Sequence, residues 1–175
     1  MGRIQVFLTN LGKYVEGCLV GEWVKLPVQE DKLEAVLRRI GINEQYEEFF
    51  ISDYESLFPN LYISEYASLS ELNEFAERVE ELADFDYEKL AAVLECESSM
   101  SIAEILEVIE AIDEFDLLAD ITTEEELGDY YLGDIFYGIP DTVLRYVDTQ
   151  RLGRDIHLEN GNGTFTSYGY LMDLR

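Results

Sequence analysis

The first sixty residues carry a pattern that predicts a small sheet. Ile4, Val6 and Leu8 recur at every second position, which is the period of a strand with one buried face. A second strand is predicted over residues 19–26, which include the single tryptophan, and a third over residues 48–54. The N-terminal part therefore reads as a sheet with a covering helix.

Apolar residues recur at helical spacing in four segments. Two of these segments begin with a capping box, Ser68 with Glu71 and Ser101 with Glu104, and Asp86 can cap a third. The four predicted helices are residues 33–40, 68–82, 86–94 and 101–112. Three helices in fewer than fifty residues predict a small helical bundle in the middle of the chain.

The C-terminal part mixes short helices and strands. Thr122 or Thr123 can cap a short acidic helix, and Asp141 can cap another that contains Val143, Leu144 and Val147. An Asn-Gly-Asn-Gly run at residues 160–163 predicts a hairpin between strands at residues 157–159 and 164–171. The single histidine, His157, then lies in a strand, where a structural role is favoured.

These elements predict an α+β fold built as an elongated chain of three small domains. The expected domains are an N-terminal sheet unit (1–62), a central helical domain (63–100) and a C-terminal α+β domain (101–175).

Charge changes this picture more than any motif does. The chain has 38 acidic and 12 basic residues, a net charge of −26, and 47% hydrophobic residues, too many for a disordered acidic tail. Such a charge excludes a basic nucleic-acid footprint and attraction to anionic lipid. The natural partner is a strongly basic surface.

The acid excess is confined to the middle of the chain. Residues 41–140 carry 28 acids and two bases, Arg78 and Lys89, whereas residues 1–40 and 141–175 are close to neutral. Salt adaptation would spread acid over the whole surface, so this distribution disfavours it. Like charges at helical spacing also destabilise a helix, so stability does not favour the pattern.

Two helical rows of glutamates stand beside the apolar stripes. Their spacing of 3, 3 and 4 residues places neighbouring carboxylates roughly 5 to 6 Å apart. The rows are Glu71, Glu74, Glu77 and Glu81, and Glu104, Glu107, Glu110 and Glu114. One such row is usually a solvated face, but two rows with almost no basic partners favour a functional anionic surface.

The charge can be compared with that of DNA. A duplex presents one negative charge per roughly 1.7 Å of axis, so the net charge corresponds to about 44 Å, or about 13 base pairs. A symmetric dimer would double this length. The acids must then lie along an elongated surface.

Motifs for catalysis or a cofactor are absent from the sequence, which lacks GxSxG, Walker A, HExxH and GxGxxG patterns. Metal binding is a weaker alternative, through an Asp84–Asp86 pair or a cluster of Asp113, Asp116 and Asp120, neither of which forms an EF-hand loop. No cofactor or dedicated metal is expected.

Cys18 and Cys96 lie far apart in the sequence, and two reduced core thiols are favoured over the alternative of a structural disulfide. The chain has no signal-peptide pattern and no apolar run long enough for a membrane span, so a cytoplasmic location is expected.

Several stretches resemble the ArdA antirestriction proteins. They are VFLTNLGKY at residues 6–14, GEWVKLP at 21–27, LADITTEEELGDYYL at 118–132, and VLRYVDTQRLGRDIHLE at 143–159, continuing to GYL at 169–171. The segment at 118–132 is similar to the family's antirestriction motif. The resemblance covers nearly the whole chain.

This resemblance implies a function and a partner. ArdA proteins are encoded on conjugative plasmids and transposons, and they inhibit type I restriction–modification enzymes without catalysis. They are elongated, curved homodimers of three-domain subunits that mimic bent B-form DNA and occupy the groove of the methyltransferase core, made of specificity and modification subunits. For this chain the acidic charge adds the expectation of no nucleic acid and no membrane as partners. The alternative is an acidic, chaperone-like module for another basic nucleic-acid-binding protein.

Two sets of site residues are predicted. The first set is the DNA-mimicking acidic surface: Glu44, Glu47, Glu48, Glu71, Glu74, Glu77, Glu81, Asp84, Asp86, Glu104, Glu107, Glu110, Asp113, Glu114, Glu124, Glu125, Glu126, Asp129 and Asp134. The second set lies in the antirestriction motif and just after it, where dimer contacts and ordinary core packing are both open: Leu127, Gly128, Tyr130, Tyr131, Ile135 and Phe136.

Overall fold

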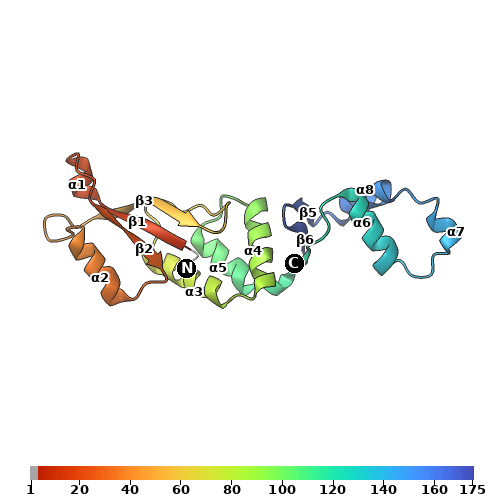
Figure 1. Ribbon diagram of the computed structural model, residues 1–175, viewed down its shortest axis with the longest axis horizontal. Helices are drawn as coiled ribbons and strands as arrows, with labels where there is room; N and C mark the ends of the chain where they lie inside the picture. The colour runs from red at the N-terminus through yellow and green to blue at the C-terminus, as the bar shows by residue number, and fades with distance from the viewer. Residues whose placement is uncertain (1–3) are drawn as a thin grey trace. The chain divides into compact units, whose positions relative to one another are not determined.

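A computed structural model describes residues 4–175, which form eight α-helices and two three-stranded antiparallel sheets (Figure 1). The predicted α+β class is confirmed. The chain divides into two compact units, the first holding residues 4–83 and 98–110, the second residues 84–97 and 111–175. The three-domain division stays a prediction.

The first unit contains the predicted N-terminal sheet. Its strands are β1 (Ile4–Asn10), β2 (Gly21–Leu26) and β3 (Phe49–Ser56), in the order β2-β1-β3, with helices α1 (Leu11–Val15) and α2 (Glu30–Arg39) between them. Ile4, Val6 and Leu8 are buried, as their alternation predicts. Buried Asn10 caps α1 through the Lys13 amide and donates to the Ile40 carbonyl, which ties the end of α2 to the sheet.

Helices α3 (Leu69–Glu81) and α5 (Ile102–Glu110) complete the first unit and contact each other. The apolar stripe of α3 is buried, including Leu72, Phe75 and Val79. The predicted capping box at Ser101 is present, since Ser101 and Glu104 form bonds in both directions. At Ser68 only the N-cap bond is formed, in which the Glu71 amide donates to Ser68 Oγ.

The second unit is built on a smaller sheet. Its elements are α4 (Asp84–Cys96), η1 (Ile112–Glu114), β4 (Phe115–Leu118), α6 (Glu124–Tyr130), η2 (Tyr131–Ile135), α7 (Asp141–Leu144), α8 (Thr149–Asn160), β5 (Gly163–Thr166) and β6 (Gly169–Asp173), with strand order β4-β6-β5. Helix α4 contacts all three strands. The Glu95 carboxylate on α4 accepts hydrogen bonds from the Ser167 amide and hydroxyl in the β5–β6 turn.

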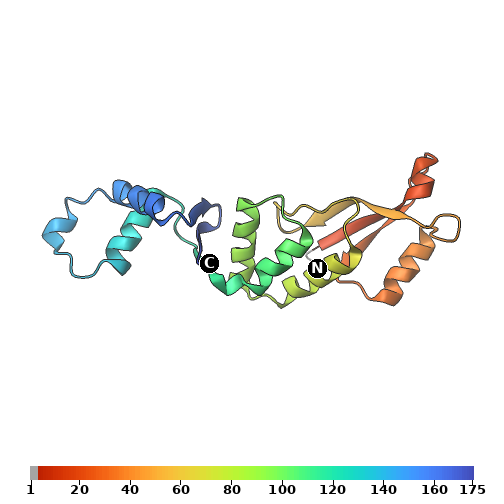
Figure 2. The same ribbon diagram turned by 180° about the vertical axis from the view of Figure 1, so that it is seen from behind.

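Two glycines set the closest helix contact in the second unit. Helices α6 and α8 lie side by side in both views (Figures 1 and 2), and they cross at Gly128 and Gly153. A Cβ on Gly153 would overlap the Glu124 carbonyl oxygen, and one on Gly128 would overlap the Thr149 carbonyl oxygen. The backbones can approach this closely only because both residues lack a side chain.

The predicted hairpin at residues 160–163 is wrong. Residues up to Asn160 continue helix α8, and Gly161 ends it in the left-handed conformation, at φ 63°. The hairpin turn lies further on, where Thr166 Oγ1 donates to the Gly169 carbonyl. Asn-Gly fits a helix C-terminus as well as a type I′ turn, because both need a positive φ. His157 therefore lies on a helix, although its contacts with Tyr170 and Phe165 fit a structural role.

Other local predictions also need correction. Helix α4 begins at Asp84, so Asp86 lies inside its first turn. Helix α7 has four residues and follows Pro140, so Asp141 is its first residue and not its cap, and Val147 lies outside it. Cys18 and Cys96 are free but exposed, so neither is a core thiol.

We expect Gly153→Ala to lower the free energy of unfolding by about 2 kcal/mol or more, because α6 and α8 must separate to admit the methyl group. Gly133→Ala is the matched control, since nothing lies within 4 Å of its Cβ position, and its effect should stay within about 0.5 kcal/mol. Urea denaturation followed by circular dichroism measures both. Equal effects would contradict the close helix crossing.

Candidate functional site

The glutamate row on α3 is assembled as predicted. Glu71, Glu74, Glu77 and Glu81 are all exposed, beside the buried stripe of the same helix. Glu77 accepts a hydrogen bond of 3.1 Å from the Asn73 amide group one turn earlier. The helix therefore holds four neighbouring carboxylates in solvent without burying any of them.

The second row is shorter than predicted. Glu104, Glu107 and Glu110 are exposed on α5, but the helix ends at Glu110. Glu114 lies in the 3₁₀ helix η1, so the expected continuation of the row to this residue is wrong. The spacing of four residues between Glu110 and Glu114 does not show where the helix ends. Helix ends depend on backbone hydrogen bonds, which the periodicity of apolar residues does not report.

Both bases of residues 41–140 are engaged within the protein. Arg78 on α3 lies 3.5 Å from Glu110 on α5. Lys89 is only 7% exposed, lies 3.7 Å from Asp86 and stands over the Phe85 ring at 5.0 Å from its centre. Neither base neutralises the rows beyond its own acidic neighbour.

The acid excess is divided evenly between the two units. Of the 28 acids and two bases in residues 41–140, each unit holds 14 acids and one base. Each unit by itself therefore presents an anionic surface.

Two of the predicted surface acids also cap helices. The Glu126 carboxylate accepts bonds from the Thr122 amide at 2.8 Å and the Thr123 amide at 3.0 Å, closing a capping box on α6. These bonds, the Thr122 amide first, lower the pKa of Glu126. The Ser101 amide, at 2.7 Å, has the same effect on the pKa of Glu104.

The remaining predicted acids differ little in exposure. Asp86 and Glu124 are half-buried, and the others are exposed: Glu44, Glu47, Glu48, Asp84, Asp113, Glu114, Glu125, Asp129 and Asp134. Within residues 4–175, no three His, Cys, Asp or Glu side chains are placed to hold a metal ion. The weaker alternative of an aspartate metal site thus has no assembled ligand set in this range.

The predicted motif residues fall into two groups. Leu127 is fully buried in a core cluster with Ile121, Ile156 and Tyr170, and Gly128 is buried at the helix crossing. Tyr130 and Tyr131 pack against that cluster. Ile135 and Phe136 are 44% and 41% exposed. The first group has a packing role, and a role in dimer contacts stays a prediction.

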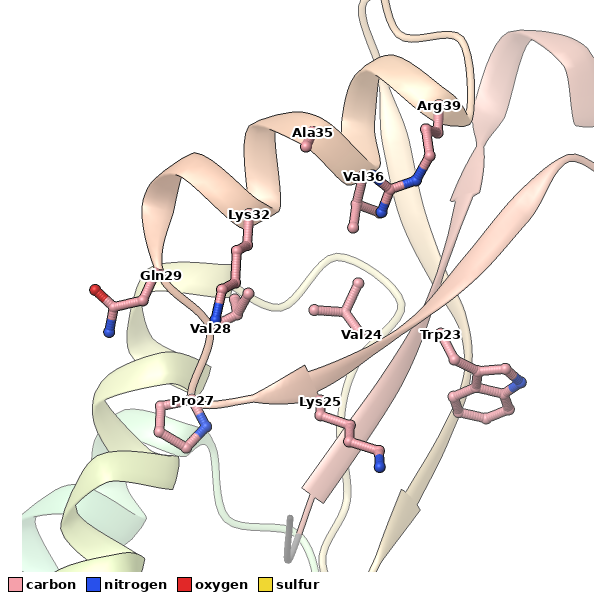
Figure 3. A pocket seen from close by; sticks show the side chains of 10 residues that line it. All are labelled: Trp23, Val24, Lys25, Pro27, Val28, Gln29, Lys32, Ala35, Val36 and Arg39. Atoms are coloured by element: carbon pink, nitrogen blue, oxygen red, sulfur yellow. The ribbon is translucent and has the colours of Figure 1, made fainter. Parts of the chain in front are cut away.

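A basic hollow in the first unit was not predicted. It has a volume of about 550 Å³ and lies between α2 and β2 (Figure 3). Three bases and no acid line it, together with apolar side chains: Trp23, Val24, Lys25, Pro27, Val28, Gln29, Lys32, Ala35, Val36 and Arg39. The available signal was the near-neutral charge of residues 1–40 in a strongly acidic chain.

No helix within residues 4–175 has both the length and the apolar character needed to cross a membrane.

The fold and surface thus define a class: an α+β protein whose exposed helical faces carry unpaired carboxylates. The chain matches the family model described as antirestriction protein (ArdA) over residues 6–172. It therefore belongs to the ArdA antirestriction family, as its sequence motifs indicate. A search of curated proteins found no match.

The cap on α6 gives a pH-dependent prediction. Because the folded pKa of Glu126 is depressed, its charge stabilises the fold above the ordinary glutamate pKa, and this stabilisation is lost as pH falls through the folded value. We expect Glu126→Gln to be less stable than the parent at pH 7, with the difference vanishing in acid.

Thermal midpoints of parent and variant between pH 7 and pH 3 measure this difference. Glu125→Gln is the control, since Glu125 lies exposed on the same turn and caps nothing within residues 4–175. The explanation fails if both variants show the same pH-dependent difference.

Proposed function

We propose that this protein is a non-catalytic inhibitor of type I restriction–modification enzymes. In this proposal it acts as a mimic of B-form DNA and occupies the DNA-binding groove of the methyltransferase core, formed by the specificity and modification subunits. It would act in the cytoplasm, where the enzyme meets incoming DNA carried by a plasmid or transposon.

The observation that carries this proposal is the excess of 28 acids over two bases in residues 41–140, with both bases already engaged. A restriction enzyme's groove is built to bind phosphates, so a surface of exposed, unpaired carboxylates can compete for the same cations. Membership of the antirestriction family supports a restriction enzyme as the partner.

The exposure of the α3 row supports an electrostatic role for these acids. Of these four neighbouring carboxylates, Glu77 accepts a hydrogen bond from the Asn73 amide group. All four are exposed and repel one another, so the fold gains little from them. Their presence is therefore better explained by a basic partner than by helix stability.

The test is competition with DNA. Replacing Glu71, Glu74, Glu77 and Glu81 by glutamine should weaken binding to a purified type I methyltransferase core at least ten-fold. The variant carries four fewer charges, so its binding releases fewer counterions than binding of the parent does. It should leave the thermal midpoint unchanged or raised. Binding should also weaken steeply with salt and be displaced by the cognate duplex.

The matched control removes the same number of charges outside residues 41–140, with Glu34→Gln, Asp141→Asn, Asp155→Asn and Glu159→Gln. Its affinity for the enzyme should stay within about two-fold of the parent. Binding that the cognate duplex does not displace would overturn the proposal of a shared site. Equal binding to unrelated basic proteins would favour the acidic chaperone-like module instead.

We also propose that the protein is a homodimer. The segment after α6 exposes several large apolar side chains on one short stretch, including Ile135, Phe136 and, at 88% exposure, Tyr137. Tyr146, at 89% exposure, follows α7. Such a concentration of exposed apolar groups is typical of an interaction surface.

Light scattering after size exclusion tests the dimer. Ile135→Ser with Phe136→Ser should raise the dissociation constant at least ten-fold, since two apolar side chains would lose their burial. The control is Leu57→Ser with Tyr62→Ser, two exposed apolar residues of the first unit, which should leave the mass unchanged. A monomeric parent at high concentration would refute self-association.

A further inference from the structure

The basic hollow borders a strand edge that pairs with no further strand within residues 4–175. Strand β2 lies at one edge of its sheet and pairs only with β1. At the opposite edge, the Ile51 amide of β3 donates to the Glu65 carbonyl, so a following segment covers part of that strand. No segment within residues 4–175 does the same for Trp23 or Lys25.

The strand register shows which backbone groups point outward. The Asn10 amide donates to the Val20 carbonyl at 2.9 Å, so these opposite residues form a hydrogen-bonded pair. In an antiparallel ladder such pairs recur at every second residue, so Leu8 with Glu22 and Val6 with Val24 are also hydrogen-bonded. The N–H and C=O groups of Trp23 and Lys25 must then face away from β1.

Side chains on both sides of this edge would contact an added strand. Figure 3 shows Val24 and Val36 facing each other between β2 and α2, with Lys32 and Arg39 reaching from α2 towards the strand. Trp23 and Lys25 point to the other side of β2. An added strand would therefore meet apolar side chains and cations together.

The charges of the hollow are unusual for this chain. Arg39 is held by Glu22 through two bonds of 2.7 and 2.9 Å, which lower the pKa of Glu22. Lys25 and Lys32 form no ion pair within residues 4–175, although the chain has 38 acids. Two unpaired cations thus flank the open edge, one on each side of β2.

We propose that the β2 edge and this hollow form a docking site for an extended acidic peptide segment of a partner protein. The segment adds a fourth strand beside β2, with its backbone paired to Trp23 and Lys25. Its carboxylates face Lys25 and Lys32, and an apolar side chain lies in the hollow against its apolar lining. The outward peptide groups favour this occupant over a nucleic acid, whose backbone cannot complete the ladder.

Lysine on an edge strand also has a protective role, because it discourages sheet-to-sheet aggregation. That role accounts for Lys25 but not for Lys32 on α2, nor for the apolar hollow between helix and strand. The test must therefore separate strand addition from both edge protection and simple charge attraction.

The probe is a capped peptide of alternating glutamate and valine, about as long as β2. Since Trp23 is the single tryptophan, its fluorescence reports binding directly. Strand addition should also slow hydrogen exchange of the Trp23 and Lys25 amides specifically. Comparison probes are the same peptide with two central valines replaced by proline, a lysine–valine peptide and a short oligothymidine.

In the full chain, Lys25→Glu with Lys32→Glu should weaken binding of the acidic peptide at least ten-fold. Arg151→Glu with Arg154→Glu makes the same charge change on exposed residues of α8 and should alter affinity less than two-fold. Circular dichroism confirms that each variant is folded. Neither pair belongs to the acidic surface proposed to bind restriction enzymes, so the two proposals fail independently.

The proposal is supported if the acidic peptide binds, protects the two amides and loses affinity when proline interrupts it. It is overturned if the proline peptide binds equally, if the lysine pair has no effect, or if no binding occurs at millimolar peptide. Protection by oligothymidine alone would identify a nucleic-acid site and would overturn it as well.

Discussion

Repulsion between carboxylates is the constraint to which this fold conforms. With 28 acids and two bases in residues 41–140, the chain cannot pair its charges and must instead hold them in water. Amphipathic helices achieve this, because the same turn that exposes Glu74 or Glu77 buries Phe75 and Val79. The apolar stripe thus offsets the repulsion that its own helix creates.

The few polar contacts available are placed where the backbone needs them. Glu104 and Glu126 satisfy amide groups at helix starts, and Glu95 fixes the β5–β6 turn against α4. An acid-rich chain has few cations for salt bridges but many carboxylate acceptors. Some of these carboxylates therefore accept backbone hydrogen bonds at helix starts, beside the Ser and Thr caps. Three basic residues, by contrast, line the hollow beside the first sheet, and two of them, Lys25 and Lys32, have no acidic partner within residues 4–175.

Much of this could be predicted from local pattern. The alternation of Ile4, Val6 and Leu8, the capping box at Ser101 and the helix cap expected at Thr122 or Thr123 located their elements, because these signals act within a few residues. The prediction of a hairpin at residues 160–163 was wrong because contacts between distant elements decide the structure there. Gly161 permits a positive φ in either a helix end or a turn, and only packing of α8 against α6 selects the helix.

The sequence by itself determined the fold class, the family and the acidic character, since charge, periodicity and motif are properties of residue order. Tertiary structure alone decided that Gly128 and Gly153 meet, that Glu114 leaves the α5 row, and that Lys25 and Lys32 flank an open strand edge. These features join residues distant in the chain or depend on where a helix ends. No local pattern encodes them, because they arise from packing between elements.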